Sequence, residues 1–125
     1  RAQLAGLEPK IGRRQEIADF YNDRLRDLQW CPHGSTSRPN RWLTVGLLPA
    51  GEDPNAICLA MNDQNIEARP AWKPMHLQPI FSHYDCFGGA FSEAVFRNGL
   101  CLPSGSSLTQ ADRERVIAVI NQQQR

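Results

Sequence analysis

RWLTVGLL, at residues 41–48, is a mostly apolar run that ends at Pro49. A short apolar run bounded by turn residues is typical of a strand. Asp53 and Pro54 follow, and this pair matches a helix N-cap with proline at the first helical position. The stretch therefore predicts a strand over 41–48, a turn, and a helix from Pro54 to about Asn62.

Before this strand, apolar side chains recur at helical spacing. They are Leu4, Leu7, Ile11, Ile17, Phe20, Tyr21, Leu25 and Leu28, and charged residues fill the other face. The pattern predicts one long amphipathic helix, or two pieces kinked near Pro9 and Gly12. Residues 31–40 are rich in Pro, Gly, Ser and Thr, so we expect a loop there.

The second half of the chain continues the alternation of strands and helices. We predict a short strand over 66–69, a helix that follows Gly88-Gly89 and closes at Asn98-Gly99, and a strand over 100–103. A last helix opens with Thr109 and Asp112, whose spacing is that of a capping box. This order predicts an α/β fold, a two-layer sandwich in which a small, mainly antiparallel sheet of three or four strands packs with helices.

Three prolines divide the segment RPAWKPMHLQPIF, residues 69–81. Each proline fixes its own φ and pushes the preceding residue out of the helical region, so we expect an extended, stiff segment. Arg69 and Lys73 suit phosphate groups, and Trp72 offers a flat face. The segment is either the edge of a ligand cleft or a surface connector. His76 is correspondingly either a substrate contact or proton donor, or a loop histidine that faces water.

Composition limits the classes of function for this single domain of 125 residues. A formal net charge of +1 argues against a dedicated nucleic-acid binder. No apolar run approaches the roughly 20 residues that a membrane-spanning helix needs. The four cysteines form no C-x-x-C pair, so we expect free thiols in a cytoplasmic protein and no metal site. The sequence shows no glycine-rich phosphate loop and no complete catalytic set.

Five strings then occur in one order: RWLT at 41–44, NIEARP at 65–70, WKPMH at 72–76, NGLCLPSG at 98–105 and LT at 108–109. This series resembles the C-terminal small domain of the DegT/DnrJ/EryC1/StrS sugar aminotransferases. It is most similar to the bacillosamine-type branch, which aminates UDP-linked 4-keto-6-deoxy N-acetylhexosamines. The resemblance covers nearly the whole chain. Its strings WKPMH, at 72–76, and GLCLPSG, at 99–105, are specific together, whereas either alone would be weak.

The resemblance implies that residues 1–125 are the small domain of a fold-type I enzyme that uses pyridoxal phosphate. In that family a large N-terminal domain holds the Schiff-base lysine, the acid that faces the pyridine nitrogen and the phosphate cradle. None of these has a counterpart in this sequence, so the large domain is expected to be absent from it. The implied parent is a homodimer that transfers an amino group, with glutamate as the expected donor, to C4 of a nucleotide-linked 4-keto-6-deoxy sugar. We expect it to serve surface polysaccharide or glycan biosynthesis, and this piece to be inactive alone.

By the same likeness, His76 is the first candidate for contact with the nucleotide sugar. Arg69, Trp72 and Lys73 are weaker candidates on the same segment. No catalytic residue, cofactor-binding residue or metal ligand is expected within these 125 residues.

Three further positions complete the interpretation of the sequence. Trp42 is expected in the core, because it enters an apolar strand. Glu93, inside the helix after Gly88-Gly89, is interpreted as structural. Residues 82–89 match no motif that we can assign.

Two other functions stay open on the sequence alone. The chain could be a stand-alone regulatory α/β module that binds a small molecule without catalysis, or an interaction domain that builds a dimer interface. The start at Arg1 inside a helical pattern leads us to expect a piece of a longer protein, although a numbering convention could produce the same start. The sugar, the nucleotide and the amino donor are not fixed by the sequence.

Overall fold

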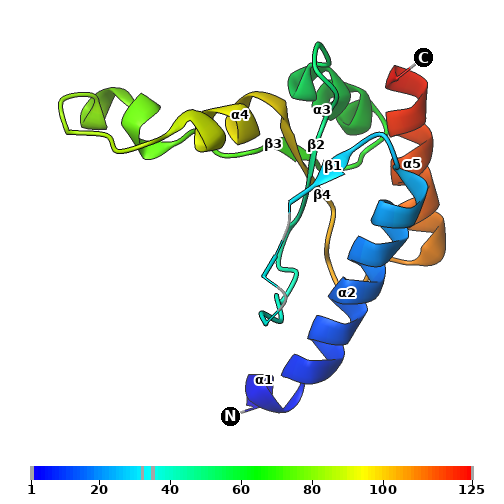
Figure 1. Ribbon diagram of the computed structural model, residues 1–125. Coiled ribbons are helices and arrows are strands. Elements are labelled where there is room, and N and C mark those ends of the chain that lie inside the picture. Colours follow the sequence, from blue (N-terminus) through cyan, green and yellow to red (C-terminus); the bar gives the residue numbers. More distant parts are fainter. Residues whose placement is uncertain (1, 32, 35, 125) are drawn as a thin grey trace.

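A four-stranded antiparallel sheet forms the centre of the molecule, in the order β1-β2-β4-β3 (Figure 1). The computed structural model describes residues 2–31, 33–34 and 36–124. The strands are β1 (Gln29–Trp30), β2 (Thr44–Leu47), β3 (Arg69–Pro70) and β4 (Gly99–Leu102). The α-helices are α1 (Ala2–Ala5), α2 (Leu7–Arg24), α3 (Pro54–Asp63), α4 (Ala90–Asn98) and α5 (Gln110–Gln123).

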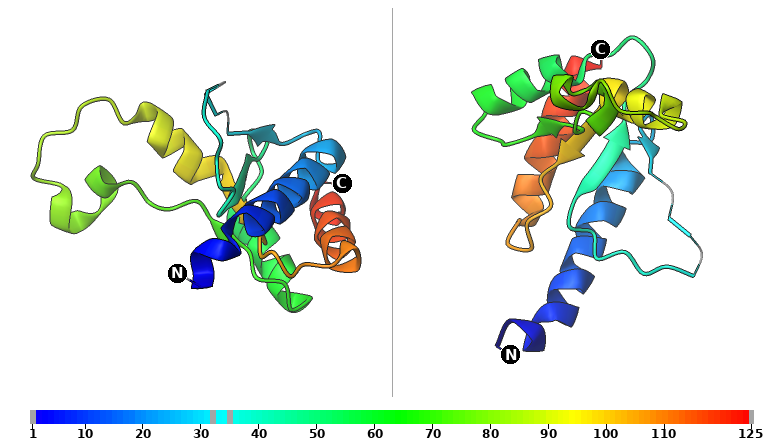
Figure 2. Two further views of the ribbon diagram at one scale, coloured as in Figure 1. Left: turned by 90° about the horizontal axis from the view of Figure 1, so that it is seen from below. Right: turned by 90° about the vertical axis from the view of Figure 1, so that its left-hand side faces the viewer.

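Helices α2, α3 and α5 cover one face of the sheet and enclose the core (Figures 1 and 2). Leu100 and Leu102 of β4 lie in that core. The helices contribute Ile17, Tyr21, Ile57, Met61, Val116, Val119 and Ile120. Because side chains alternate across a strand, Val45 and Cys101 face the other side of the sheet, where they line a groove. The predicted two-layer α/β sandwich with a small antiparallel sheet is confirmed.

The N-terminal helix is divided into two pieces, which was one of the two alternatives, but the break lies at Gly6, between α1 and α2, and not near Pro9 or Gly12. Pro9 lies in the first turn of α2, where its missing N–H costs no intrahelical hydrogen bond. It therefore marks the start of the helix and does not kink it. The same helix runs through Gly12 without interruption.

Capping contacts confirm the predicted N-terminal ends of two helices, α3 and α5. The Asp53 carboxylate accepts a hydrogen bond from the Asn55 backbone N–H at 2.9 Å, with Pro54 in the first turn of α3. At α5, the Asp112 N–H donates to the Thr109 hydroxyl at 3.2 Å, and the Asp112 carboxylate accepts from the Thr109 N–H at 2.9 Å. This reciprocal pair is a capping box and confirms the expected start of the last helix.

Replacing Thr109 with alanine should lower the free energy of unfolding by about 1 kcal/mol, because the α5 N-cap loses its acceptor. Urea unfolding followed by circular dichroism measures the change. Ser107→Ala, in the exposed turn before the cap, is the matched control and should change the stability by less than roughly 0.5 kcal/mol. Equal losses in the two variants would contradict the capping role of Thr109.

The proline-rich segment is not extended throughout, which corrects the expectation from its sequence. Met75–Leu77 and Pro79–Phe81 form two short 3-10 helices, η1 and η2. Pro79 occupies the first position of η2, so this proline starts a helical turn. Gln78, which precedes it, keeps the expected extended backbone, with φ −81° and ψ 132°.

We call residues 75–98 the arm, which comprises η1, η2, the following loop and α4. Figure 1 shows that the arm projects away from the sheet, on the side opposite α5. β3 leads the chain toward the arm, and α4 returns it directly into β4. No helix in the described part of the chain is both long enough and apolar enough to cross a bilayer.

Candidate functional site

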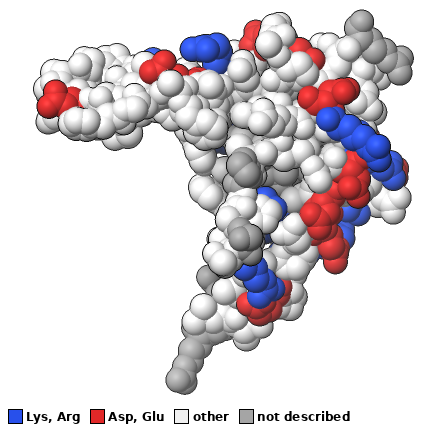
Figure 3. Space-filling view, in the orientation of Figure 1, with Lys and Arg blue, Asp and Glu red and all other residues white. Residues whose placement is uncertain are grey.

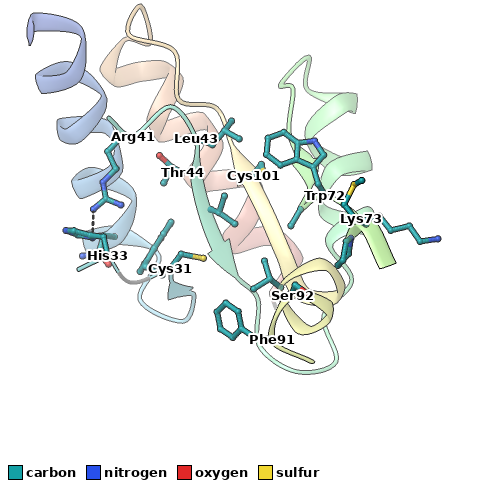
Figure 4. A pocket seen from close by; sticks show the side chains of 18 of the residues that line it. Cys31, His33, Arg41, Leu43, Thr44, Trp72, Lys73, Phe91, Ser92 and Cys101 are labelled. Carbon is teal, nitrogen blue, oxygen red and sulfur yellow. Dashed lines mark hydrogen bonds between the residues drawn. The ribbon is translucent and has the colours of Figure 1, made fainter. Parts of the chain in front are cut away.

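The face of the sheet that the helices leave open carries a groove of about 1020 Å³ (Figure 4). Leu43, Val45 and Cys101 line its floor. Trp72 contributes from the segment between β3 and the arm, and Phe91 from the first turn of α4. Charged side chains gather over α2 and α5, whereas the hollow beside the arm shows few of them (Figure 3). The groove is therefore a mostly apolar concave surface, the usual form of a ligand or docking site.

Trp42 does not lie in the core, so this expectation was wrong. β2 begins at Thr44, two residues later, and the Trp42 side chain is 59% exposed. Its indole stacks on that of Trp72, which is 61% exposed, with ring centroids 5.7 Å apart and 27° between the planes. The structure thus brings together two tryptophans that are thirty positions apart in the sequence.

His76 lies at the base of the arm, and its side chain is only 21% exposed. Its Nε2 is 3.0 Å from Oε1 of Glu93, on α4. The ring also packs over Gly89, where an added Cβ would lie 3.1 Å from it, and the φ of +105° at Gly89 favours glycine. The imidazole therefore does not project freely into water, and its contact with the Glu93 carboxylate joins η1 to α4.

The other candidates on the proline-rich segment are dispersed. Arg69 donates to the Glu67 carboxylate through Nε at 3.0 Å, and it lines a second, smaller hollow of about 490 Å³ with Trp72. Lys73 borders the larger groove, but its ammonium group points away from it (Figure 4). Of the four candidates on this segment, Trp72 is the one that borders both hollows. His76 lies beside the larger groove, whose lining includes its neighbour Met75.

Arg41 is a groove residue that sequence reasoning missed. Its Nε donates to Oε1 of Gln15 at 3.1 Å, and its Nη2 is 3.2 Å from Nδ1 of His33. Neither partner is a carboxylate, so no anionic side chain in these contacts balances the guanidinium. The backbone φ of +48° at Arg41 is rare for a residue with a side chain. The sequence offers one signal that could have identified Arg41. The dipeptide Arg41-Trp42 pairs a basic residue with a tryptophan, as Trp72-Lys73 does in the reverse order.

Two thiols border the groove, but neither has the properties of a nucleophile. Burial raises the pKa of Cys31 and of Cys101 above the ordinary thiol value, which keeps both protonated at neutral pH. Within the part of the chain that the structure describes, no cluster of three or more His, Cys, Asp or Glu could hold a metal ion. The groove therefore offers binding surface, and the described residues supply no complete catalytic set.

Comparison with known proteins identifies the family. The sequence model of the DegT/DnrJ/EryC1/StrS aminotransferase family matches residues 1–121. EpsN of Bacillus subtilis (strain 168), named as a pyridoxal phosphate-dependent aminotransferase, is 39% identical over 95% of this chain and 32% of its own length. GDP-perosamine synthase of Caulobacter vibrioides is 30% identical over 97% of this chain and 34% of its own.

A solved structure supports the same assignment. A DegT DnrJ EryC1 StrS aminotransferase from Brucella abortus superposes with a TM-score of 0.84 and 26% identity, over 97% of this chain and 33% of that one. The chain spans about a third of the length of the curated relatives it matches. With the family matched over nearly all of its residues, this chain belongs to the DegT/DnrJ/EryC1/StrS aminotransferase family.

Proposed function

We propose that this chain is the C-terminal small domain of a pyridoxal phosphate-dependent sugar aminotransferase. The observation that carries the proposal is the family match over residues 1–121, in a chain only about a third as long as its relatives. The open face of the sheet and the arm form one wall of the active-site cleft, and a larger domain of the same polypeptide forms the other. Residues 1–125 are then one structural part of the parent enzyme.

The described residues do not fit a pyridoxal phosphate site of their own. Lys10 and Lys73 are the only lysines, and both are exposed. The side chain of Lys73 points away from the groove (Figure 4). We therefore assign the cofactor to the larger domain, and no step of its chemistry is derived from this chain.

Exposed apolar side chains on the arm favour a large partner surface. Met75, Ile80, Tyr84, Phe87 and Phe91 each have more than half of their surface exposed. So many exposed apolar side chains on one segment are uncommon on a protein that functions alone. This surface is covered, we propose, by the rest of the polypeptide within a homodimer of the parent enzyme. We therefore expect the isolated piece to self-associate.

For the substrate we propose a nucleotide-linked 4-keto-6-deoxy sugar, aminated at C4 with glutamate as donor, in polysaccharide or glycan biosynthesis. The relative named GDP-perosamine synthase supports a nucleotide sugar as the class of substrate. The motif strings favour a UDP-linked N-acetylhexosamine of the bacillosamine type. His76, held by Glu93 at the base of the arm, is the proposed contact to the sugar.

An amino-transfer assay of the full-length protein tests the proposal directly. We expect amino transfer from glutamate to at least one member of a panel of UDP-linked and GDP-linked 4-keto sugars. The 125-residue chain, assayed in parallel, should transfer none. A full-length protein that binds panel members but transfers no amino group to any of them would instead favour the regulatory binding module.

A further inference from the structure

The stacked tryptophans Trp42 and Trp72 stand where the two dipeptides Arg41-Trp42 and Trp72-Lys73 meet. We propose that the open face of the Trp72 indole, backed by Trp42, stacks against the nucleobase of the nucleotide-linked ligand. The proposal rests on the function proposed above and adds to it a subsite for the base. Trp42 acts through Trp72 and is a positioning residue.

Exposure is the first observation that points to a ligand. Stacking leaves 59% of Trp42 and 61% of Trp72 accessible, so the pair hides little of its own apolar surface. A nucleobase presents a flat π-face that covers such a surface, and base–aromatic stacking tolerates any base. Because Trp72 borders the larger groove, a stacked base has room beside it for the remainder of the ligand.

The backbone that carries each indole is restrained. The Trp42 N–H donates to Oδ1 of Asn40 at 3.0 Å, next to the left-handed backbone of Arg41. Trp72 follows Ala71, whose N–H donates to the Gly99 carbonyl at 2.8 Å. Prolines at 70 and 74 restrict the backbone on either side. A surface fixed in this way loses little conformational entropy when a ligand binds, and backbone strain of the Arg41 type concentrates at functional sites.

Charge supports a nucleotide over an uncharged aromatic ligand. Arg41 lies across the groove from Trp72 (Figure 4), and its contacts to Gln15 and His33 include no carboxylate. By contrast, Arg69 is paired with the Glu67 carboxylate. One carboxylate, Asp19, also borders the groove and accepts a hydrogen bond from Gln15 at 2.8 Å. The Arg41 guanidinium is therefore positioned to attract the phosphates of a ligand whose base lies on Trp72.

Titration calorimetry of the full-length protein with UDP, GDP and uridine tests the subsite. Trp72→Ala should weaken UDP or GDP binding by about 5-fold to 150-fold, the loss expected when one base–aromatic stack is removed. Trp72→Phe should retain most of the affinity, and Trp42→Ala should weaken binding less than Trp72→Ala does. Arg41→Gln should weaken binding of UDP but leave that of uridine unchanged.

The control is Leu59→Ala, which removes a side chain that is 67% exposed on α3, outside both hollows. It should bind nucleoside diphosphates like the wild-type protein. In kinetics, Trp72→Ala should raise KM by a larger factor than it lowers kcat, because the base is remote from the reacting carbon. A merely structural tryptophan would instead lower the melting temperature and leave the KM of the folded fraction unchanged.

The failure of this subsite is distinguishable from failure of the proposed function. If the wild-type protein transfers amino groups and Trp72→Ala binds UDP and GDP as tightly as wild type, the subsite is wrong and the enzyme assignment stands. The surface would then be a packing surface for another part of the polypeptide. If the wild-type protein binds UDP through Trp72 but transfers no amino group, the subsite stands and the enzyme assignment fails.

Discussion

Gly99→Ala is expected to destabilise the fold by about 3 kcal/mol, the upper end of the usual cost of overpacking. Gly99 is buried where α4 passes directly into β4. A Cβ there would lie 2.3 Å from the Val95 carbonyl oxygen and 2.6 Å from the Ala71 Cβ. Both neighbours are fixed by the backbone, so neither can move aside cheaply. The φ of −82° is ordinary, and the effect therefore comes from space and not from dihedral strain.

Gly12→Ala is the matched control for the same chemical change. Gly12 lies within α2, and an added Cβ would meet nothing within 4 Å. Because alanine favours a helix more than glycine does, the free energy of unfolding of this variant should rise by up to about 1 kcal/mol. The urea concentration at the midpoint of unfolding should therefore fall for Gly99→Ala and rise for Gly12→Ala. A Gly99→Ala protein as stable as wild type would contradict the close packing of Gly99 against Val95 and Ala71.

Local signals predicted the elements whose ends are fixed by neighbouring residues. The N-caps at Asp53 and Thr109 placed the starts of α3 and α5 correctly, because a cap acts within three residues of itself. The strand expected over 100–103 was observed at 99–102, since proline cannot continue it. The closing of α4 at Asn98-Gly99 was also correct in position, although Gly99 is extended and serves close packing.

Tertiary contacts decided the elements that local signals missed. Helical spacing continues through Leu25 and Leu28, yet α2 ends at Arg24 and both leucines are buried outside it. β1 has only two residues, and it exists because Trp30 pairs with Gly46 of β2. No periodicity within 25–30 distinguishes this turn and strand from another turn of helix.

In the candidate site, too, local sequence signals identified some features, and tertiary contacts decided the others. The proline-rich segment was recognised as a place where functional residue types gather, but its geometry depends on partners elsewhere in the chain. Glu93, seventeen positions after His76, orients the imidazole. Trp42 precedes β2 and was expected in the core, since only the fold shows that Trp72 lies beside it on the surface. Sequence alone named the residue types and could not give the pairs they form.

His76→Ala in the full-length protein is expected to lower kcat/KM for the keto sugar by about 10-fold to 150-fold. This is the loss expected when one hydrogen bond to a charged group, worth roughly 1.5–3 kcal/mol, is removed. The absorbance of bound pyridoxal phosphate should not change, because we assign the cofactor to the larger domain. Steady-state kinetics and the absorbance spectrum of the purified protein measure both effects.

Two variants separate a substrate contact from a brace of the arm. His83→Ala removes an exposed histidine from the loop between η2 and α4, where its ring lies tilted against that of Tyr84, and should leave the kinetics unchanged. Glu93→Gln retains an acceptor for the His76 ring but removes the charge, so it should lower kcat/KM less than His76→Ala does. If His76→Ala and Glu93→Gln lower the melting temperature equally and leave kcat/KM intact, the pair only joins η1 to α4. In that case the contact to the sugar must come from another residue on this wall of the cleft.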